Sequence, residues 1–225
     1  MSGESLENIE QESIKYVDEN LEFNRSRWGN PDFWNGKDQF GYRWGGGRQW
    51  TTGDIAELAD RFLRPYVGDR YDLKVLELSP GAGRFTAEVI RYASTIDFLD
   101  MNQSCLDVCE ERFQYMPTPI RYYVNDGRSC EMLEDSDYEL IVCYDSMVHM
   151  HPEIIESYVS QLADRMAPGG IIWLDHAGLG ANDVGHRTDM TPEKMSEYFE
   201  SSGLEVVSQD FRSHRDCISV GRKPR

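Results

Sequence analysis

The sequence has few lysines and no long apolar segment. Only five of its 23 basic residues are lysine, and 40 aspartates and glutamates give a net charge of -17. A chain with this charge repels phosphate backbones and anionic lipid, so nucleic acids and membrane surfaces are not expected as partners. It has no run of 18 uncharged apolar residues, so no membrane span is expected. The acidity fits either a protein that works at high salt or an ordinary acidic cytosolic enzyme.

The cysteine pattern lacks the marks of a disulfide framework or a metal site. The five cysteines are an odd number and form no CxxC motif. Cys105 and Cys109 lie one helical turn apart, where two half-buried thiols are expected. The acidic N-terminus has no apolar stretch of the signal-peptide type, and it is not an Arg-rich transit peptide. A cytoplasmic protein in a reducing environment is therefore expected.

From residue 73 onward, apolar runs and helical runs alternate along the chain. The apolar runs predict strands over residues 73–78, 95–99, 120–124, 138–144 and 170–174. Helical patterns lie between them, over residues 84–92, 103–115 and 152–166, with a short turn near 129–133. A helix over 191–202 and a hairpin of strands over 204–211 and 216–221 complete the pattern. The expected fold is α/β: a doubly wound, mostly parallel, seven-stranded sheet with an antiparallel C-terminal hairpin.

The N-terminal part has a different character. Residues 5–22 show the spacing of a loosely amphipathic helix. Residues 24–53 hold four of the five tryptophans and many glycines without any period, which indicates a loop or lid. Thr52 then reads as the N-cap of a helix that runs to about Arg64. We expect an N-terminal helix and aromatic lid over residues 1–54 and a core over 55–225, within one structural domain.

A glycine-rich turn follows the first strand of the core. It reads Glu77-Leu78-Ser79-Pro80-Gly81-Ala82-Gly83, at the end of a mostly apolar run. No GK[ST] of a Walker loop is present, and the third glycine of a dinucleotide fingerprint is missing, which disfavours a nicotinamide oxidoreductase. The acidic Glu77 would repel a pyrophosphate but suits a cationic ligand with a free amine. S-adenosylmethionine is such a ligand.

With these residues in order, the chain resembles the class I, Rossmann-like methyltransferases over about residues 55–221. Their glycine motif reads E/D-x-G-x-G-x-G, and Ser79 departs from its first glycine. The acids in "IDFLDMN" and "VNDG", then "LIVCYDS" and "RMAPGGIIWLDH", follow in the family's order. The resemblance implies S-adenosylmethionine contacts from Glu77, Ser79, Gly81, Gly83, Asp100, Met101, Asp126, Gly127 and Tyr144. Two alternatives stay open: Asp100 and Asp126 would each also serve as caps of the helical segments that follow them.

Three histidines follow the predicted fourth and fifth strands, where ligands bind in open α/β sheets. A hydroxyl acceptor must lose a proton as it is methylated, which calls for a general base. His149 is the favoured base, His176 is second and His151 third. Asp145 is expected to assist as a catalytic residue. A divalent metal such as magnesium is not favoured; if one binds, Asp145, Asp175 and His176 are its expected ligands.

The acceptor is expected beneath the aromatic segment 28–50. Tyr42, Arg43, Trp44 and His151 are the expected acceptor contacts, since aromatic rings stack on sugar faces. "RWGNPDFWNGKDQFGYRWGGG" together with "VHMHP" is also similar to small bacterial methyltransferases of sugar and polysaccharide pathways. The expected function is O-methylation of a small polar acceptor, first a sugar or glycoside. The alternatives are a natural-product O- or N-methyltransferase and a non-catalytic S-adenosylmethionine-binding module; a homo-oligomer is left open.

Overall fold

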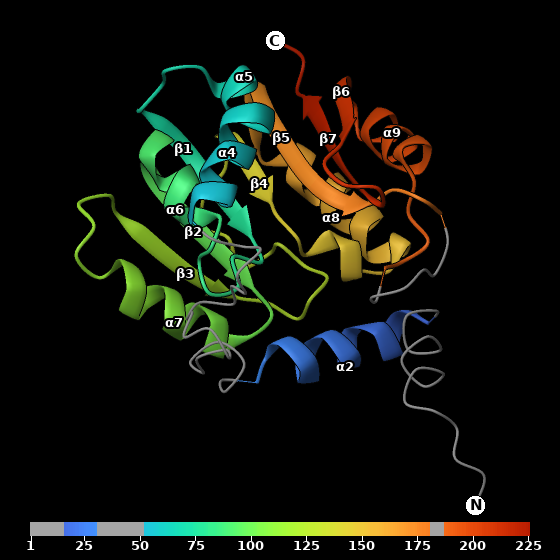
Figure 1. Cartoon of the computed structure of the whole chain (residues 1–225), viewed down its shortest axis with the longest axis horizontal. Coiled ribbons are helices and arrows are strands. Elements are labelled where there is room, and N and C mark those ends of the chain that lie inside the picture. The colour runs from blue at the N-terminus through green and yellow to red at the C-terminus, as the bar shows by residue number, and fades with distance from the viewer. Residues whose placement is uncertain (1–15, 31–51, 181–186) are drawn as a thin grey trace, which may run out of the picture.

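The structure is a computed structural model that describes residues 16–30, 52–180 and 187–225 (Figure 1). The first part of the predicted N-terminal helix lies outside the described residues. So does most of the aromatic segment, including Tyr42, Arg43 and Trp44. The division into residues 1–54 and 55–225 remains a prediction. Among the described helices, none is both long and apolar enough to cross a membrane.

A seven-stranded sheet forms the centre of the molecule. Its strands are β1 (Leu73–Leu78), β2 (Ala93–Asp100), β3 (Ile120–Val124), β4 (Tyr138–Cys143), β5 (Met166–Ala177), β6 (Glu205–Phe211) and β7 (Asp216–Arg222). They lie in the order β3-β2-β1-β4-β5-β7-β6. The first five run parallel, and β7 pairs antiparallel with both β5 and β6. The predicted doubly wound, mostly parallel sheet with an antiparallel C-terminal hairpin is confirmed.

Helices cover both faces of the sheet (Figure 1). One face packs against α4 (Thr52–Phe62), α5 (Arg64–Val67), α6 (Thr86–Val89) and α7 (Gln103–Phe113). The other packs against α8 (Pro152–Asp164) and α9 (Pro192–Ser201). Alternate residues of one strand divide between the two cores: Val75 belongs to the first and Leu76 to the second. Strands buried on both faces read as continuous apolar runs, which is why the sequence revealed them.

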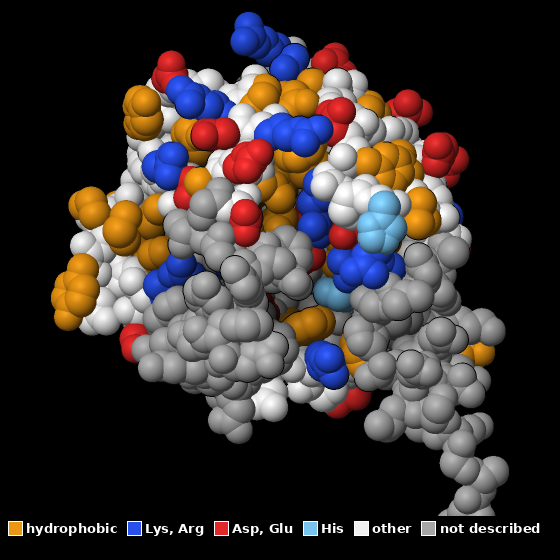
Figure 2. All heavy atoms as spheres, viewed as in Figure 1, with side chains coloured by type: hydrophobic (Ala, Val, Ile, Leu, Met, Phe, Trp, Pro, Cys, Tyr) orange, Lys and Arg blue, Asp and Glu red, His pale blue; other side chains and the backbone are white. Residues whose placement is uncertain are grey.

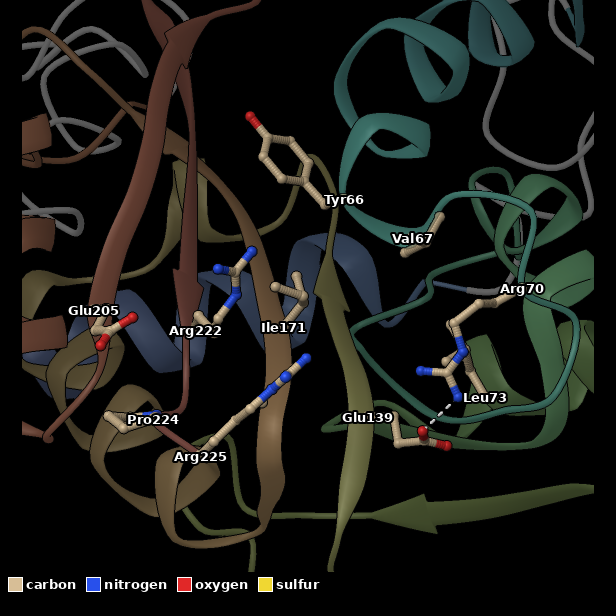
Figure 3. Close-up of a pocket in the computed structure, with 11 residues that line it drawn as sticks. Tyr66, Val67, Arg70, Leu73, Glu139, Ile171, Glu205, Arg222, Pro224 and Arg225 are labelled. Atoms are coloured by element: carbon tan, nitrogen blue, oxygen red, sulfur yellow. Dashed lines mark hydrogen bonds and ion pairs between the residues drawn. The ribbon is translucent and has the colours of Figure 1, made fainter.

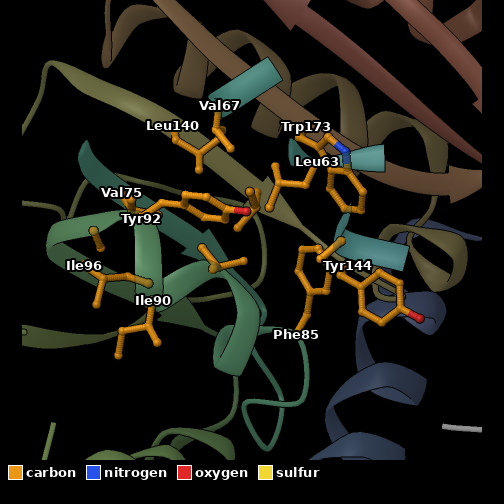
Figure 4. Close-up of a cluster of buried hydrophobic side chains, with 14 of the residues drawn as sticks. Leu63, Val67, Val75, Phe85, Ile90, Tyr92, Ile96, Leu140, Tyr144 and Trp173 are labelled. Carbon is orange, nitrogen blue, oxygen red and sulfur yellow. The ribbon is translucent and has the colours of Figure 1, made fainter. Parts of the chain in front are cut away.

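Aromatic rings fill the first core beneath α4. Phe85 stacks on Trp173 and on Tyr144, with ring centroids 5.1 and 4.7 Å apart (Figure 4). The indole nitrogen of Trp173 donates to the Phe62 carbonyl at 2.7 Å, which ties β5 to α4. Each buried aromatic side chain contributes about 1.5–3 kcal/mol of hydrophobic stabilisation.

Two predicted elements differ in extent. Strand β5 begins at Met166, earlier than predicted, because the apolar run that marks it covers only its centre. The predicted helix 84–92 is broken: α6 starts at Thr86, a 3-10 helix (Ile90–Tyr92) follows, and residues 81–85 form a turn. The first residues of the predicted helix therefore belong to the glycine-rich turn.

The predicted N-terminal helix ends later than expected. Within the described residues, α2 (Val17–Trp28) overlaps the predicted helix 5–22 and extends into the segment predicted to be an aperiodic loop. Its buried residues are Asn20 and Asn24, and both amides donate to the carbonyl of His149, at 2.9 and 3.0 Å. Apolar spacing gave no sign of the part of the helix beyond residue 22, because amide hydrogen bonds and the Trp28 ring hold it. In Figure 1 this helix lies apart from the two layers, across one end of the sheet.

The glycine turn gives a direct test of the packing. Gly83 and Gly203 have nearly the same φ, +72° and +73°, but an added Cβ would lie 2.4 Å from Cε2 of Phe113 at Gly83 and meet no atom within 4 Å at Gly203. We expect Gly203→Ala to lower the free energy of unfolding by about 1 kcal/mol, the backbone cost alone. Gly83→Ala should cost about 1–3 kcal/mol more through overpacking. Urea denaturation measures both; equal losses would contradict the close approach of Phe113.

Candidate functional site

The glycine turn joins β1 to α6 at the carboxyl end of the sheet. Three of its residues have left-handed backbone conformations: Ser79 at φ 54°, Gly81 at 57° and Gly83 at 72°. The Ser79 amide donates to the carbonyl of Leu99 at 2.7 Å, which fixes the turn to β2. Ser79 therefore occupies a conformation that favours glycine, at a cost of about 1 kcal/mol. This is the position where the resemblance expected glycine.

Glu77 closes β1 immediately before the turn. Its side chain is buried, and its carboxylate accepts a hydrogen bond from the Thr86 hydroxyl at 2.7 Å. Burial raises the pKa of Glu77 to about 7, against the opposing effects of Thr86 and Arg112. Among the described residues, no positive group is paired with the Glu77 carboxylate. A cation placed beside it would therefore strongly stabilise its ionised form.

Asp100 closes β2 and lies against the same turn. Burial raises its pKa to about 7, although its carboxylate accepts hydrogen bonds from the backbones of Asn102, Gly81 and Met101. The Asn102 bond is 2.9 Å long. Asp100 does not cap α7, whose N-cap is Asn102; its carboxylate instead ties the glycine turn to the residues just before that helix.

Asp126 is exposed and caps the turn after β3. Its carboxylate accepts from the backbone amides of Arg128 and Ser129, both at 2.8 Å. Partial burial raises its pKa, but these hydrogen bonds and the charge of Arg128 outweigh that effect and lower it. Next to it, Gly127 at φ 91° lies so close to Leu21 and Met101 that a Cβ would approach them to 2.8 and 3.0 Å. The ends of β2 and β3 and helix α2 therefore meet here.

Tyr144, which follows β4, has a buried hydroxyl. Its oxygen has no hydrogen-bond partner among the described residues, and burial raises the pKa of the phenol. The guanidinium carbons of Arg84 and Arg212 lie 5.4 and 5.3 Å from the ring centroid. The ring packs with the first core while the hydroxyl points away from it (Figure 4). An unpaired buried hydroxyl costs about 1–3 kcal/mol, so a bound ligand would gain by satisfying it.

A network of three arginines and three aspartates occupies the carboxyl ends of β4 and β5. Arg212 donates to Asp175 and Asp145, both at 2.8 Å, and Arg84 donates to Asp145 at 2.7 Å. The network is completed by a double hydrogen bond of Arg187 to Asp216, at 2.7 and 2.9 Å. No sequence signal indicated it, because its members come from four separate segments.

The two strand-end aspartates are held by arginines. Burial raises the pKa of Asp145, but Arg84, Arg212, His149 and Arg187 outweigh it and lower the pKa, so this carboxylate is ionised at neutral pH. Asp175 and His176 do not join it in a metal site: Arg212 bridges the carboxylates, and His176 bonds elsewhere. Within residues 16–30, 52–180 and 187–225, no group of three His, Cys, Asp or Glu side chains could hold a metal ion.

His149, the predicted general base, lies after β4 as expected, in a 3-10 helix (Met147–His149). Its side chain is buried against Trp28, with ring centroids 4.9 Å apart. Helix α2 clamps the same loop, since Asn20 also accepts from the His151 amide at 2.9 Å. His151 caps α8, and its Nδ1 accepts from the Glu153 amide at 3.3 Å. Sequence reasoning missed the contributions of Asn20 and Asn24.

His176 lies inside the sheet. It is fully buried, its Nδ1 lies 2.6 Å from the Ala177 carbonyl, and its Nε2 lies 2.7 Å from the Ser219 hydroxyl. Since a carbonyl only accepts, Nδ1 carries the proton and Nε2 accepts from Ser219. Burial lowers the pKa of His176 to about 4. With both ring nitrogens bonded away from solvent, its position argues against the predicted role as base or metal ligand.

Residues 75–170 match the family described as "Methyltransferase domain". This match to a methyltransferase domain covers less than half of the chain. The match begins in β1 and includes the glycine turn, Asp100, Asp126 and the His149 loop. The prediction of a methyltransferase from the order of these landmarks is confirmed; the roles of the individual site residues remain predictions.

Several known proteins are similar to this chain in sequence or in fold. Over 101 residues it is 28% identical to phosphoethanolamine N-methyltransferase 1 of Triticum aestivum, a stretch that covers 44% of this chain and 20% of the wheat enzyme. Magnesium protoporphyrin IX methyltransferase of Synechocystis, solved with bound S-adenosylhomocysteine, has a TM-score of 0.68 at 12% identity, covering 91% of this chain and 99% of that one. An S-adenosylmethionine-bound amino pentose methyltransferase of Micromonospora echinaspora has a TM-score of 0.59 at 16% identity, covering 79% and 93%. These structures share the fold.

The buried His176 predicts a pH dependence of stability. Its folded pKa of about 4 lies below the unfolded value of about 6.5, so the unfolded chain binds the extra proton between these values. The contribution of His176 to the free energy of unfolding should therefore fall by about 3 kcal/mol as pH drops from 6.5 to 4. Glu77 and Asp100, whose folded pKa values are raised to about 7, contribute in the opposite direction over this range, so the test is a difference between variants. In urea denaturation, the stability of His176→Gln relative to the wild type should rise as pH drops from 6.5 to 4. The relative stability of His214→Gln, an exposed control, should stay constant, and equal behaviour of the two variants would contradict the burial argument.

Arg212 predicts a large loss of stability on substitution. Its side chain is 4% exposed, and its removal leaves Asp145 and Asp175 without their shared cation. Arg212→Leu should lower the free energy of unfolding by about 3–5 kcal/mol. Arg64→Leu, which breaks ion pairs with exposed aspartates, should cost far less, because solvent screens those pairs. Urea denaturation at pH 7 compares the two, and similar losses would refute the central role of Arg212.

Proposed function

We propose that this protein transfers the methyl group of S-adenosylmethionine to a hydroxyl of a small polar acceptor, first a sugar or glycoside. The observation that carries the proposal is His149, a buried histidine beside the ionised Asp145 at the carboxyl end of β4. Strand β4 pairs with β1, so this histidine follows the strand next to the one that leads into the glycine turn.

The residues around the glycine turn fit the methyl donor. Glu77 and Asp100 are buried carboxyls with pKa raised to about 7, and a ligand amine or ribose hydroxyls would supply the partners that favour their charged forms. Gly81 and Gly83 let the backbone approach closely. The donor supplies an electrophilic methyl group; Ser79, Met101, Asp126, Gly127 and Tyr144 complete the proposed contacts.

The proton of the acceptor hydroxyl goes to His149. Asp145 is negative and lies close enough to His149 to interact with it, so it stabilises the imidazolium that forms when His149 takes the proton. Helix α2 positions the base by holding its carbonyl with Asn20 and Asn24 and by packing Trp28 on its ring. The Trp28 ring also offers an apolar surface that excludes water and on which a sugar face can stack. Tyr42, Arg43, Trp44 and His151 remain the proposed acceptor contacts.

Two other functions deserve a direct comparison. The wheat relative is named for an N-acceptor, and an amine that is already neutral needs no strong base. The amino pentose methyltransferase shares the fold and is named for an amino sugar, which supports a sugar as the acceptor; the choice of a hydroxyl depends on His149 and Asp145. A module that binds the cofactor without catalysis would need neither His149 nor Asp145 beside the glycine turn.

The test uses His149→Ala and His151→Ala, two variants in one loop. Deleting the His149 ring leaves the carbonyl that Asn20 and Asn24 bind, so the loop should stay in place. With methyl-labelled S-adenosylmethionine and a panel of sugar acceptors, we expect His149→Ala to lower kcat by about 10²–10⁴-fold. His151→Ala should retain most activity, and both should bind S-adenosylhomocysteine like the wild type in calorimetry. Parallel assays with magnesium and with EDTA show whether a metal contributes.

The outcomes separate the three functions. Turnover that survives in His149→Ala and prefers amine acceptors would replace the proposal with N-methylation. Binding of S-adenosylhomocysteine without turnover on any acceptor would favour the non-catalytic module. A protein that does not bind S-adenosylhomocysteine would refute the proposal as a whole.

A further inference from the structure

A pocket lies at the end of the sheet opposite the glycine turn, away from the carboxyl ends of the parallel strands. It encloses about 500 Å³ and is formed where β1, β4 and β5 begin, where β6 begins and where the antiparallel β7 ends (Figure 3). Its apolar wall includes Val67, Leu73 and Ile171, and the ring of Tyr66 lies at one end. The volume falls within the roughly 300–1,000 Å³ of small-molecule sites. Neither the glycine turn nor His149 contributes to it.

The polar lining of this pocket carries more positive than negative charge. Three arginines face two glutamates in a chain whose net charge is -17. Arg70 is engaged, because it donates to Glu139 at 2.6 Å and to Asp72 at 3.1 Å. Glu139 in turn accepts from the Lys74 amide at 3.2 Å. This side of the pocket is therefore already neutral.

Arg222 and Arg225 are different. Within the described part of the chain neither side chain makes a hydrogen bond or ion pair, whereas at least eight other arginines pair with carboxylates. Both are exposed, and in Figure 3 the Arg222 side chain lies beside Ile171 and that of Arg225 below it. Glu205 lies beside Arg222 on the neighbouring strand, as its partner in the register, without an ion pair to it. Two arginine side chains without ion pairs thus line one pocket.

We propose that this pocket binds a small phosphate-bearing molecule, with the phosphate held between Arg222 and Arg225. A guanidinium fork takes two oxygens of an oxyanion. A tetrahedral phosphate has enough oxygens to meet two forks from two directions, while a single carboxylate fills only one. The rest of the molecule packs against the apolar wall and Tyr66, in the part of the pocket that the phosphate does not occupy. This site is separate from the proposed methyl-transfer site and does not depend on it.

Inorganic pyrophosphate is the probe, because it lacks the adenosine that the other edge is proposed to bind. Calorimetric titration at low ionic strength should show binding that falls about tenfold in Arg222→Gln. Glu205→Gln removes the adjacent negative charge and should strengthen binding. Arg61→Gln, on the exposed face of α4, is the matched control and should leave the affinity unchanged.

Three results would overturn the proposal. The first is no binding of pyrophosphate, or equal loss in Arg222→Gln and Arg61→Gln. The second is equal affinity for succinate, which would show no preference for phosphate. The third is displacement of pyrophosphate by saturating S-adenosylhomocysteine, which would place the probe at the other edge. Failure of S-adenosylhomocysteine to bind would count against the methyltransferase proposal alone, since the pyrophosphate titration is read separately.

Discussion

Four neighbouring parallel strands end in carboxyl groups, and the molecule must prevent their charges from repelling one another. Glu77, Asp100 and Asp175 are buried and Asp145 is partly buried, at the carboxyl ends of β1, β2, β5 and β4. Arginines bond to Asp145 and Asp175, although burial still raises the pKa of Asp175 to about 6. Burial raises the pKa of Glu77 and Asp100 to about 7, and no cation among the described residues is bonded to them. The proposed cationic donor binds at these two strand ends.

The sequence pattern predicted what depends on local order. Strands buried on both faces, the acid before the glycine turn and the hairpin at the edge were all found from residues close together in the chain. The network around Arg212 was not, because Arg84, Asp145 and Arg187 meet only after the chain folds. The extension of helix α2 to Trp28 was missed for a related reason: Asn20 and Asn24 bond to a carbonyl more than 120 residues away, and apolar periodicity carries no trace of that contact.

The histidines show the limit of position as a guide. His149 and His176 were both predicted to follow strands of the same sheet, and both were candidates for the general base. Strand β5 continues to Ala177, so His176 stays within the ladder and pairs with Cys217 on β7. Strand β4 ends at Cys143, and the chain then leaves the sheet before it reaches His149. Strand length, which the apolar run underestimates for β5, decides which ring lies beyond the edge and which lies in the core.

The attachment of α2 has a thermodynamic consequence. The helix docks through amide hydrogen bonds and the Trp28 ring. Its two fully buried side chains are both polar, and Val17 and Leu21 are only partly buried against the second core. Release of apolar surface raises the heat capacity of an opening reaction, and α2 releases less of it per residue than a strand buried on both faces. Opening of α2 should therefore have a smaller heat-capacity change per residue than unfolding of the sheet, and its equilibrium should curve less with temperature.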